Sequence, residues 1–326
     1  MSTYRVSLVA FALAASFGSA PATAQSYPTR PVTVVVPFAA GGPTDTLARI
    51  LSERMSARLG QPFVIENAAG AAGSLGTRRV ARSAPDGYTV IIGFLGTHVL
   101  NGAIYSLEYD VQKDFEPIAL LSSNPLLIVA KKAMPARDLK ELIAWLRANP
   151  GKAVQGTPGA GTPAHVAGVY FQRASGTEFQ FVPYRGAAPS MQDLVGGHID
   201  LMIDQASNAL PHVRDANIRA YAVTAKARLT SAPDIPTVDE AGLPGFYVSV
   251  WSAMWAPKGA TENVVLKLNA AVVDALKDPT VARRLSDLGQ EIPENSELTP
   301  AALARFQRTE IEKWWPIVKT MALEAK

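Results

Sequence analysis

Two loops rich in glycine, proline and threonine contain the residues best suited to hold an anion. The first loop, Phe38 to Asp45, follows an apolar β-branched run at Val32 to Val36 and precedes an amphipathic helix that Gly60 should end. The second loop, Gly156 to Pro163, follows a short strand at Lys152 to Gln155 and also leads into a helix. Backbone N–H groups in such turns lack partners and are aligned with the helix dipole. Both loops therefore predict anion sites, and we expect the anion to be an organic carboxylate.

Three further side chains stand where they could reach such a ligand. Asp45 and Asp204 each lie at a loop or strand end that should face the cleft, where an acid can orient waters or accept a ligand N–H or O–H group. The alternative for Asp45 is a first-turn acid favoured by the helix dipole, and for Asp204 a solvated strand end. His165, in the first turn of the second helix, is either a pocket donor or an ordinary helix residue.

The remaining patterns argue against catalysis, cofactors and metals. The loop from Gly156 has the glycine spacing of a P-loop, but Thr162 and Pro163 replace the lysine and hydroxyl pair that a nucleotide site needs. The glycines from Gly70 are spaced GxxGxxG, which is no dinucleotide fingerprint, and Ser74 lacks the first glycine of a hydrolase elbow. The four histidines show no metal-ligand spacing, and the chain has no cysteine. We therefore expect no catalytic residue, no cofactor and no metal.

Strands that alternate with helices form the frame for these loops. Further strands are predicted at Phe63 to Asn67, Tyr88 to Gly93, Phe179 to Tyr184 and Ile199 to Asp204. The alternation favours an α/β fold with doubly wound, mostly parallel sheets and a ligand site at the carboxyl ends of the strands. Phe115 to Ala130 reads as a crossover into a second lobe, and Ile218 to Thr224 as the strand that returns the chain to the first. The helix-ending glycines Gly60 and Gly176 are 176 − 60 = 116 residues apart, so the second lobe repeats the plan of the first.

The beginning of the chain predicts export. Residues 1–24 combine a positive start at Arg5, an apolar stretch too short to span a membrane and a small-residue cleavage signature before Gln25. The remaining 326 − 24 = 302 residues are long enough for two domains without disulfides. The formal net charge is +3 and the basic residues are scattered, which argues against nucleic-acid binding. We expect a soluble, monomeric protein of the periplasm.

A set of motifs extends over essentially the whole mature chain. In order they are PFAAGGPTDTLAR, ENAAGAAGSLG, APDGYT, GTPGAGTPAH, VPYRGAAPSMQDLVGGHIDLMID, DIPTVDEAGLPG and a tryptophan followed by APKG. This combination resembles the extracytoplasmic solute-binding receptors of tripartite tricarboxylate transporters, the Bug family. The resemblance implies a two-lobed type II periplasmic binding protein, with residues 25–122 and 223–326 in lobe 1 and residues 123–222 in lobe 2. It also implies a receptor without catalytic activity that delivers its ligand to membrane permease subunits.

The resemblance also implies which residues contact the ligand. Lobe 1 would offer donors from Phe38, Ala39, Gly42 and Thr44, with Gly73, Ser74 and Thr97 along its wall; lobe 2 would offer Thr157, Gly161, Thr162 and His165; and Asp45 and Asp204 carry over by position. Asn101 is followed by glycine where the family often has proline, and Gln155 stands where an aromatic residue is common. Because both border the distal side of the pocket, a dicarboxylate, a tricarboxylate, an acidic amino acid and an aromatic acid all stay open as ligands. A sensory co-receptor for a membrane kinase and an exported hydrolase are the alternative functions.

Overall fold

Three parallel strands form the centre of each lobe in the computed structural model, which describes residues 27–320; the predicted signal peptide, residues 1–24, lies outside them. In the first lobe β1 (Val32–Val36) lies between β2 (Phe63–Asn67) and β3 (Thr89–Phe94). In the second lobe β5 (Val154–Thr157) lies between β6 (Gln180–Pro183) and β7 (Leu201–Gln205). With β9 (Ser249–Pro257) and β4 (Phe115–Lys131) between the two groups, the sheet order is β2-β1-β3-β9-β4-β7-β5-β6. The predicted α/β frame is confirmed, and the two central strands are the ones that precede the two loops.

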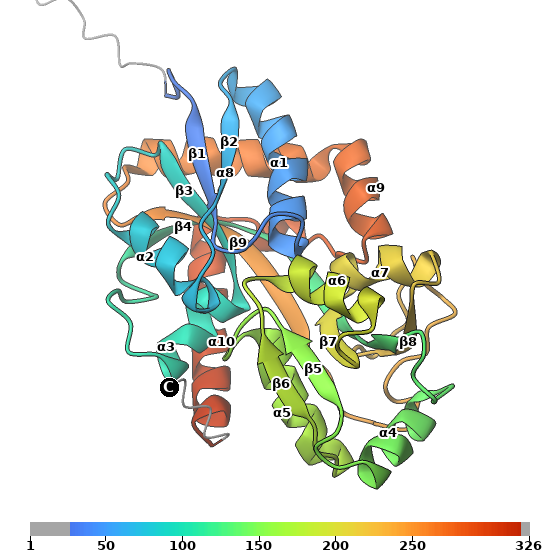
Figure 1. Ribbon diagram of the computed structural model, residues 1–326. Coiled ribbons are helices and arrows are strands. Elements are labelled where there is room, and N and C mark those ends of the chain that lie inside the picture. The colour runs from blue at the N-terminus through green and yellow to red at the C-terminus, as the bar shows by residue number, and fades with distance from the viewer. Residues whose placement is uncertain (1–26, 321–326) are drawn as a thin grey trace, which may run out of the picture.

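Two long strands connect the lobes (Figure 1). β4 (Phe115–Lys131) pairs with β9 (Ser249–Pro257) from Phe115 to Pro125, and then with β7 and β8 (Ile218–Val223) from Leu126 onward, always antiparallel. The predicted crossover at Phe115 to Ala130 is confirmed.

The prediction that Ile218 to Thr224 returns the chain to the first lobe was wrong. β8 pairs with the second-lobe half of β4, and the return is made by β9, which pairs with β3 and with the first-lobe half of β4. Both β8 and β9 are apolar strands that pair with β4, so local composition does not tell which sheet each one joins. The lobe boundaries at residues 122 and 223 stay a prediction.

Helices cover both faces of each lobe. The first lobe carries α1 (Pro43–Leu59), α2 (Ser74–Ala81), α3 (Asn101–Ile104), α8 (Glu262–Lys277), α9 (Pro279–Asp287) and α10 (Pro300–Thr320), with the short turns η1 (Ala71–Gly73), η2 (Gly96–Leu100) and η3 (Asn295–Glu297). The second carries α4 (Leu139–Ala148), α5 (Pro163–Ser175), α6 (Ala187–Gly196) and α7 (Ala206–Arg214). Along β1, Val34 packs in the core that α1 and α8 cover, and Val35 packs in the core on the other face, because neighbouring strand residues point to opposite sides.

The helix boundaries that fix the two loops follow the expected signals. α1 and α5 both have proline at their first helical position, and they end at Gly60 and Gly176, whose φ angles are 69° and 60°. These angles lie in the left-handed region that glycine enters without strain. No helix among residues 27–320 combines the length and the apolar composition that crossing a bilayer requires.

Candidate ligand-binding cleft between the lobes

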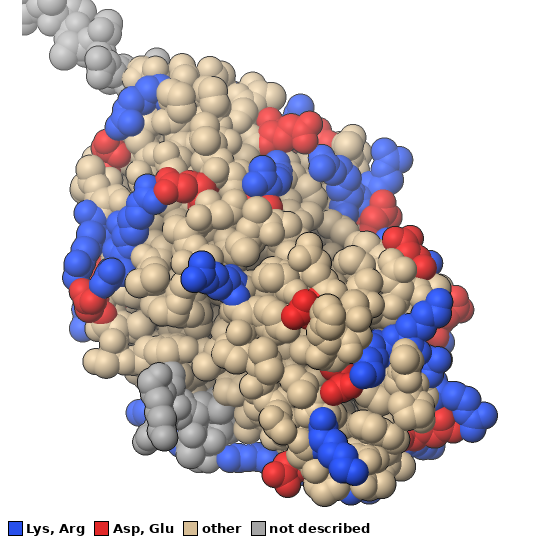
Figure 2. Space-filling model, in the orientation of Figure 1, with Lys and Arg blue, Asp and Glu red and all other residues tan. Residues whose placement is uncertain are grey.

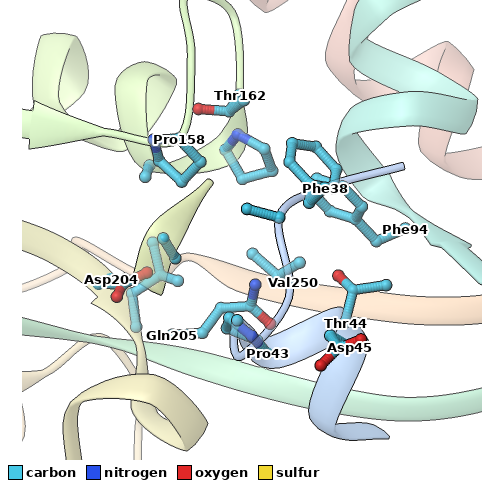
Figure 3. Close-up of a pocket in the computed structure, with 16 residues that line it drawn as sticks. Phe38, Pro43, Thr44, Asp45, Phe94, Pro158, Thr162, Asp204, Gln205 and Val250 are labelled. Atoms are coloured by element: carbon cyan, nitrogen blue, oxygen red, sulfur yellow. The ribbon is translucent and has the colours of Figure 1, made fainter. Parts of the chain in front are cut away.

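A cavity between the lobes is lined by the starts of four helices (Figure 3). Thr44 belongs to the first turn of α1, Ala164 to that of α5 and Ala187 to that of α6, and Gln205 is the residue directly before α7. Phe38 and Phe94, whose ring centroids are 5.2 Å apart, form one wall. The empty space among the lining residues is about 440 Å³, part of it open to solvent.

These four helix starts make the cavity attractive to anions. The first N–H groups of a helix have no partner inside the helix, and the aligned peptide dipoles place roughly half a positive charge at each N-terminus. None of the residues that line the cavity is a lysine or an arginine. Figure 2 shows basic and acidic side chains interspersed over one face of the molecule, without a broad basic stripe. Positive potential in the cavity therefore comes from backbone groups.

The carboxylate of Asp45 organises the first loop. Its side chain is 3% exposed and accepts hydrogen bonds from the Gly41 N–H at 2.9 Å, from Asn67 Nδ2 at 3.0 Å and from Arg49 Nε and Nη2 at 2.8 and 3.1 Å. Asn67 also donates to the Phe38 carbonyl at 3.0 Å. Burial alone would raise the pKa of Asp45, but the bonds from Arg49, Gly41 and Asn67 outweigh it and hold the pKa below its ordinary value. Asp45 is thus an anion that fixes the loop backbone.

A histidine holds the second loop. The Gly161 N–H donates to His165 Nδ1 at 2.9 Å, which requires the neutral ring to carry its proton on Nε2. Burial lowers the pKa of His165 and so favours this neutral form. The Thr162 hydroxyl donates to the Gly159 carbonyl at 2.7 Å, and the φ of Gly161 is 74°. These hydrogen bonds fix the loop backbone on the side away from the cavity. The start of α5 can therefore face the cavity.

The two lobes touch at the rim of this cavity. The Ala39 N–H donates to the Arg185 carbonyl at 3.4 Å, and the Tyr105 hydroxyl donates to the Ala160 carbonyl. A Cβ built on Gly159 would lie 3.4 Å from Cα of Ala72. The described residues thus adopt a closed arrangement of the lobes.

The structure brings seven of the thirteen predicted site residues to the cavity. They are Phe38, Ala39, Gly42, Thr44, Asp45, Thr162 and Asp204. Gly73 lines a neighbouring hollow that shares Phe38 and Pro158 with the cavity. Ser74 donates to the Ala71 carbonyl, and Thr97 bonds to Phe94 within its own turn. Thr157 and Gly161 belong to the second loop and His165 bonds to it, but none of the three lines the cavity. Ligand contact by all thirteen stays a prediction.

Sequence reasoning missed the starts of α6 and α7. Ala187 and Gln205 line the cavity, as do Val250 of β9 and Leu126 of β4. The signal for α6 was Gly186, a glycine directly before an apolar helical pattern. Nothing in the sequence places these elements beside the first loop, because the sheet order that does so depends on long-range pairing.

Asp204 is the acid in the cavity lining that makes no ion pair with any of residues 27–320. The residue is 2% exposed, and its carboxylate accepts a hydrogen bond from Asn208 Nδ2 at 2.5 Å. Burial raises the pKa of Asp204 to about 6, against the smaller opposing effect of the bonds from Asn208 and the Gln205 backbone. No group of three metal-ligating side chains is present among residues 27–320.

Comparisons with known proteins agree on one family. Residues 47–323 match the family model described as Tripartite tricarboxylate transporter family receptor. MatC from Rhodopseudomonas palustris, solved with bound malate, is 43% identical, with a TM-score of 0.86 over 90% of this chain and 100% of that one. The periplasmic binding protein BugD is 38% identical, with a TM-score of 0.88 over 92% and 100% of the two chains. A second R. palustris protein, solved with adipate, is 35% identical, with a TM-score of 0.87 over 90% and 98%.

Proposed function

This chain belongs to the tripartite tricarboxylate transporter receptor family, a family of two-lobed periplasmic binding proteins rather than enzymes, and from that premise we propose that it captures a small dicarboxylate. The acid is held between the lobes and is then delivered to a membrane permease. The relatives whose structures contain malate and adipate support a dicarboxylate.

The convergence of four helix starts on one cavity is the observation that carries this proposal. With roughly half a positive charge at each N-terminus, the starts of α1, α5, α6 and α7 together offer about +2, which matches a dicarboxylate dianion. A hydrogen bond to a charged group contributes about 1.5–3 kcal/mol, so four to six of them supply about 6–18 kcal/mol. Micromolar binding needs about 8 kcal/mol after the costs of ordering. Backbone groups can therefore bind the acid without an arginine.

A thermal melting experiment tests whether the protein binds a dicarboxylate. The purified mature chain is heated with malate, with adipate and with adipamide, the neutral diamide that has the same shape as adipate. We expect the acids to raise the melting temperature in a concentration-dependent way, because a ligand at one hundred times its Kd stabilises the folded state by about 2.7 kcal/mol. Adipamide should give no shift. The proposal is overturned if no acid shifts the melting temperature at about 1 mM, or if sulfate at equal ionic strength does so equally well.

Transport and location rest on the family and on the predicted signal peptide. We propose that residues 1–24 direct export and are removed before Gln25, so that the receptor works in the periplasm. Mass spectrometry of the protein from a periplasmic extract of its host should find Gln25 as the new N-terminus. A deletion of the permease genes beside the receptor gene should abolish uptake of the labelled acid, and unchanged uptake would contradict delivery to a permease.

A further inference from the structure

The ligand cavity poses an electrostatic problem that the proposed function alone does not solve. A dicarboxylate must enter a space that already contains the buried side chain of Asp204 (Figure 3), on the side opposite Phe38 and Phe94. The other acid in the lining, Asp45, bonds to Arg49 outside the cavity. Within the part of the chain that the structure describes, Asp204 bonds to neutral groups, the amide of Asn208 and the backbone of Gln205. An ionised Asp204 would repel the ligand and also occupy the positive start of α7.

The elements packed around Asp204 offer no charge that would relieve this repulsion. The strand β7 packs against β4, β5, α5, α6 and α7. The titratable side chains on these elements have other partners or lie at distant helix ends. Glu116 pairs with Lys258, and Lys131 pairs with Asp200. Asp193 accepts from the Tyr184 hydroxyl, His165 accepts from the Gly161 N–H, Arg214 donates to the backbone carbonyl of Asp287, Tyr170 stacks on Phe246, and Arg173 and His212 lie in the last turns of α5 and α7. Burial raises the pKa of Asp204 to about 6, and the two hydrogen bonds from neutral groups oppose this rise only in part.

We propose that the cavity takes up one proton from solution with each dicarboxylate it binds, and that this proton is held between Asp204 and the nearer carboxylate of the ligand. The inference rests on the proposed function, and it specifies how that site accommodates a dianion. Two carboxylates that share a site keep one proton between them, because both cannot remain ionised at close range. The neutral carboxyl donates an O–H···O⁻ bond, which is short and strong, and it leaves the start of α7 free to face the ligand. Asp204 thereby becomes the residue that couples ligand affinity to pH.

Calorimetric titration directly measures how many protons are taken up when the acid binds. Malate and adipate are titrated into the wild-type protein at about pH 7.5 in Tris and in Hepes, two buffers with different ionisation enthalpies. We expect an uptake of about one proton per bound acid, because Asp204 alone is mostly ionised at this pH. The Kd should rise about 25-fold between about pH 6.5 and about pH 8, with a slope that approaches one per pH unit above the pKa of Asp204 near 6. Free carboxylic acids are already ionised in this range, so the slope reports the protein.

The variant Asp204→Asn tests whether Asp204 is responsible for the proton uptake. Its amide oxygen can still accept from Asn208, and its NH₂ group is a permanent donor toward the cavity. We expect this variant to bind both acids without proton uptake, with a flat pH profile and at least wild-type affinity at about pH 8. The matched control Asp215→Asn removes the same charge from an exposed position at the end of α7 and should keep the wild-type slope. Thermal melting establishes that both variants are folded.

The outcomes separate this inference from the proposed function. Tight binding of either acid with proton uptake near zero, or an unchanged pH slope in Asp204→Asn, overturns the proposal of proton uptake at Asp204. Either result leaves the proposed dicarboxylate receptor function standing. Failure of both acids to bind the wild type at any pH overturns the dicarboxylate receptor, and the proton with it. If Asp204→Asn does not fold, the two-buffer titration of the wild type decides alone.

Discussion

Replacement of Asp45 by asparagine should loosen the loop that begins the ligand cavity. In the wild type, Oδ2 accepts from Gly41 and Arg49, and Oδ1 accepts from Arg49 and Asn67, so four donors meet two oxygens. Asparagine offers one oxygen and one NH₂ group, which can satisfy at most two of these donors and turns N–H groups toward the other two. The change removes charge and acceptors but hardly alters the volume.

The expected loss of stability follows from those bonds. Each hydrogen bond to a charged group contributes about 1.5–3 kcal/mol, so two of them give about 3–6 kcal/mol. The side chain of Arg49 is 55% exposed and recovers part of its share from water. About 2–4 kcal/mol remains, which for a chain of this size corresponds to a fall in melting temperature of about 3–6 °C. The affinity for dicarboxylates should fall as well, because the loop backbone loses its fixed geometry.

Urea unfolding at a series of pH values provides the assay. Because the folded-state pKa of Asp45 is lowered, its stabilisation is fully present above the unfolded value near 3.9 and is lost as the pH falls through the folded value. The penalty of Asp45→Asn should therefore be constant between about pH 5 and about pH 8 and should shrink in more acidic solution. Glu53→Gln, which removes the same charge from a side chain that is 75% exposed and pairs with Arg284, should cost less than about 1 kcal/mol. A penalty for Asp45→Asn no larger than that of the control would refute the role of Asp45 in the loop.

Three further changes probe the closed arrangement and the second loop. Tyr105→Phe removes the hydroxyl that joins the lobes and should weaken dicarboxylate binding by about 2- to 10-fold, with an unchanged Kd as the contradictory result. Gly161→Ala places a methyl group 2.9 Å from Ile104 at a backbone φ of 74° and should lower the affinity. The control Gly151→Ala has a similar φ of 68° but open space around the added methyl group, so it should lower the affinity less. Equal effects of the two variants on affinity would mean that backbone strain alone matters. His165→Asn keeps an acceptor near the position of Nδ1 and should bind more tightly than His165→Leu, and equal Kd values would show that the bond to the loop is unimportant.

Sequence features within single stretches of the chain were sufficient to predict the strands, loops and helix ends that position the starts of α1 and α5. Val32 to Val36, Pro43 and Gly60 specify a buried strand, a helix start and a helix end within one continuous stretch. The same is true of Pro163 and Gly176 in the second lobe. These features depend on intrinsic backbone preferences, and they appear in the structure where the sequence predicts them.

The rest of the site depends on pairing between distant strands. The chain returns to the first lobe through the strand that pairs with β4 from Phe115 to Pro125. This strand is β9 and not β8, although both have suitable apolar sequences. The same pairing brings the start of α7 and the side chain of Asp204 to the first loop. Thr97 shows a local use that the sequence did not indicate: its hydroxyl accepts from the Phe94 N–H at 3.1 Å within its own turn, and its contact with a ligand stays a prediction. Burial, which raises the pKa of Asp204, is likewise a property of the assembled lobes.

A crystal structure of the protein with malate tests the central claim most directly, namely that backbone groups at converging helix starts hold the acid. We predict both carboxylates inside the interlobe cavity, bonded directly or through one ordered water to the first N–H groups of at least two of α1, α5, α6 and α7 at about 2.7–3.0 Å. Malate held by an arginine or lysine side chain, or bound outside this cavity, would contradict the claim.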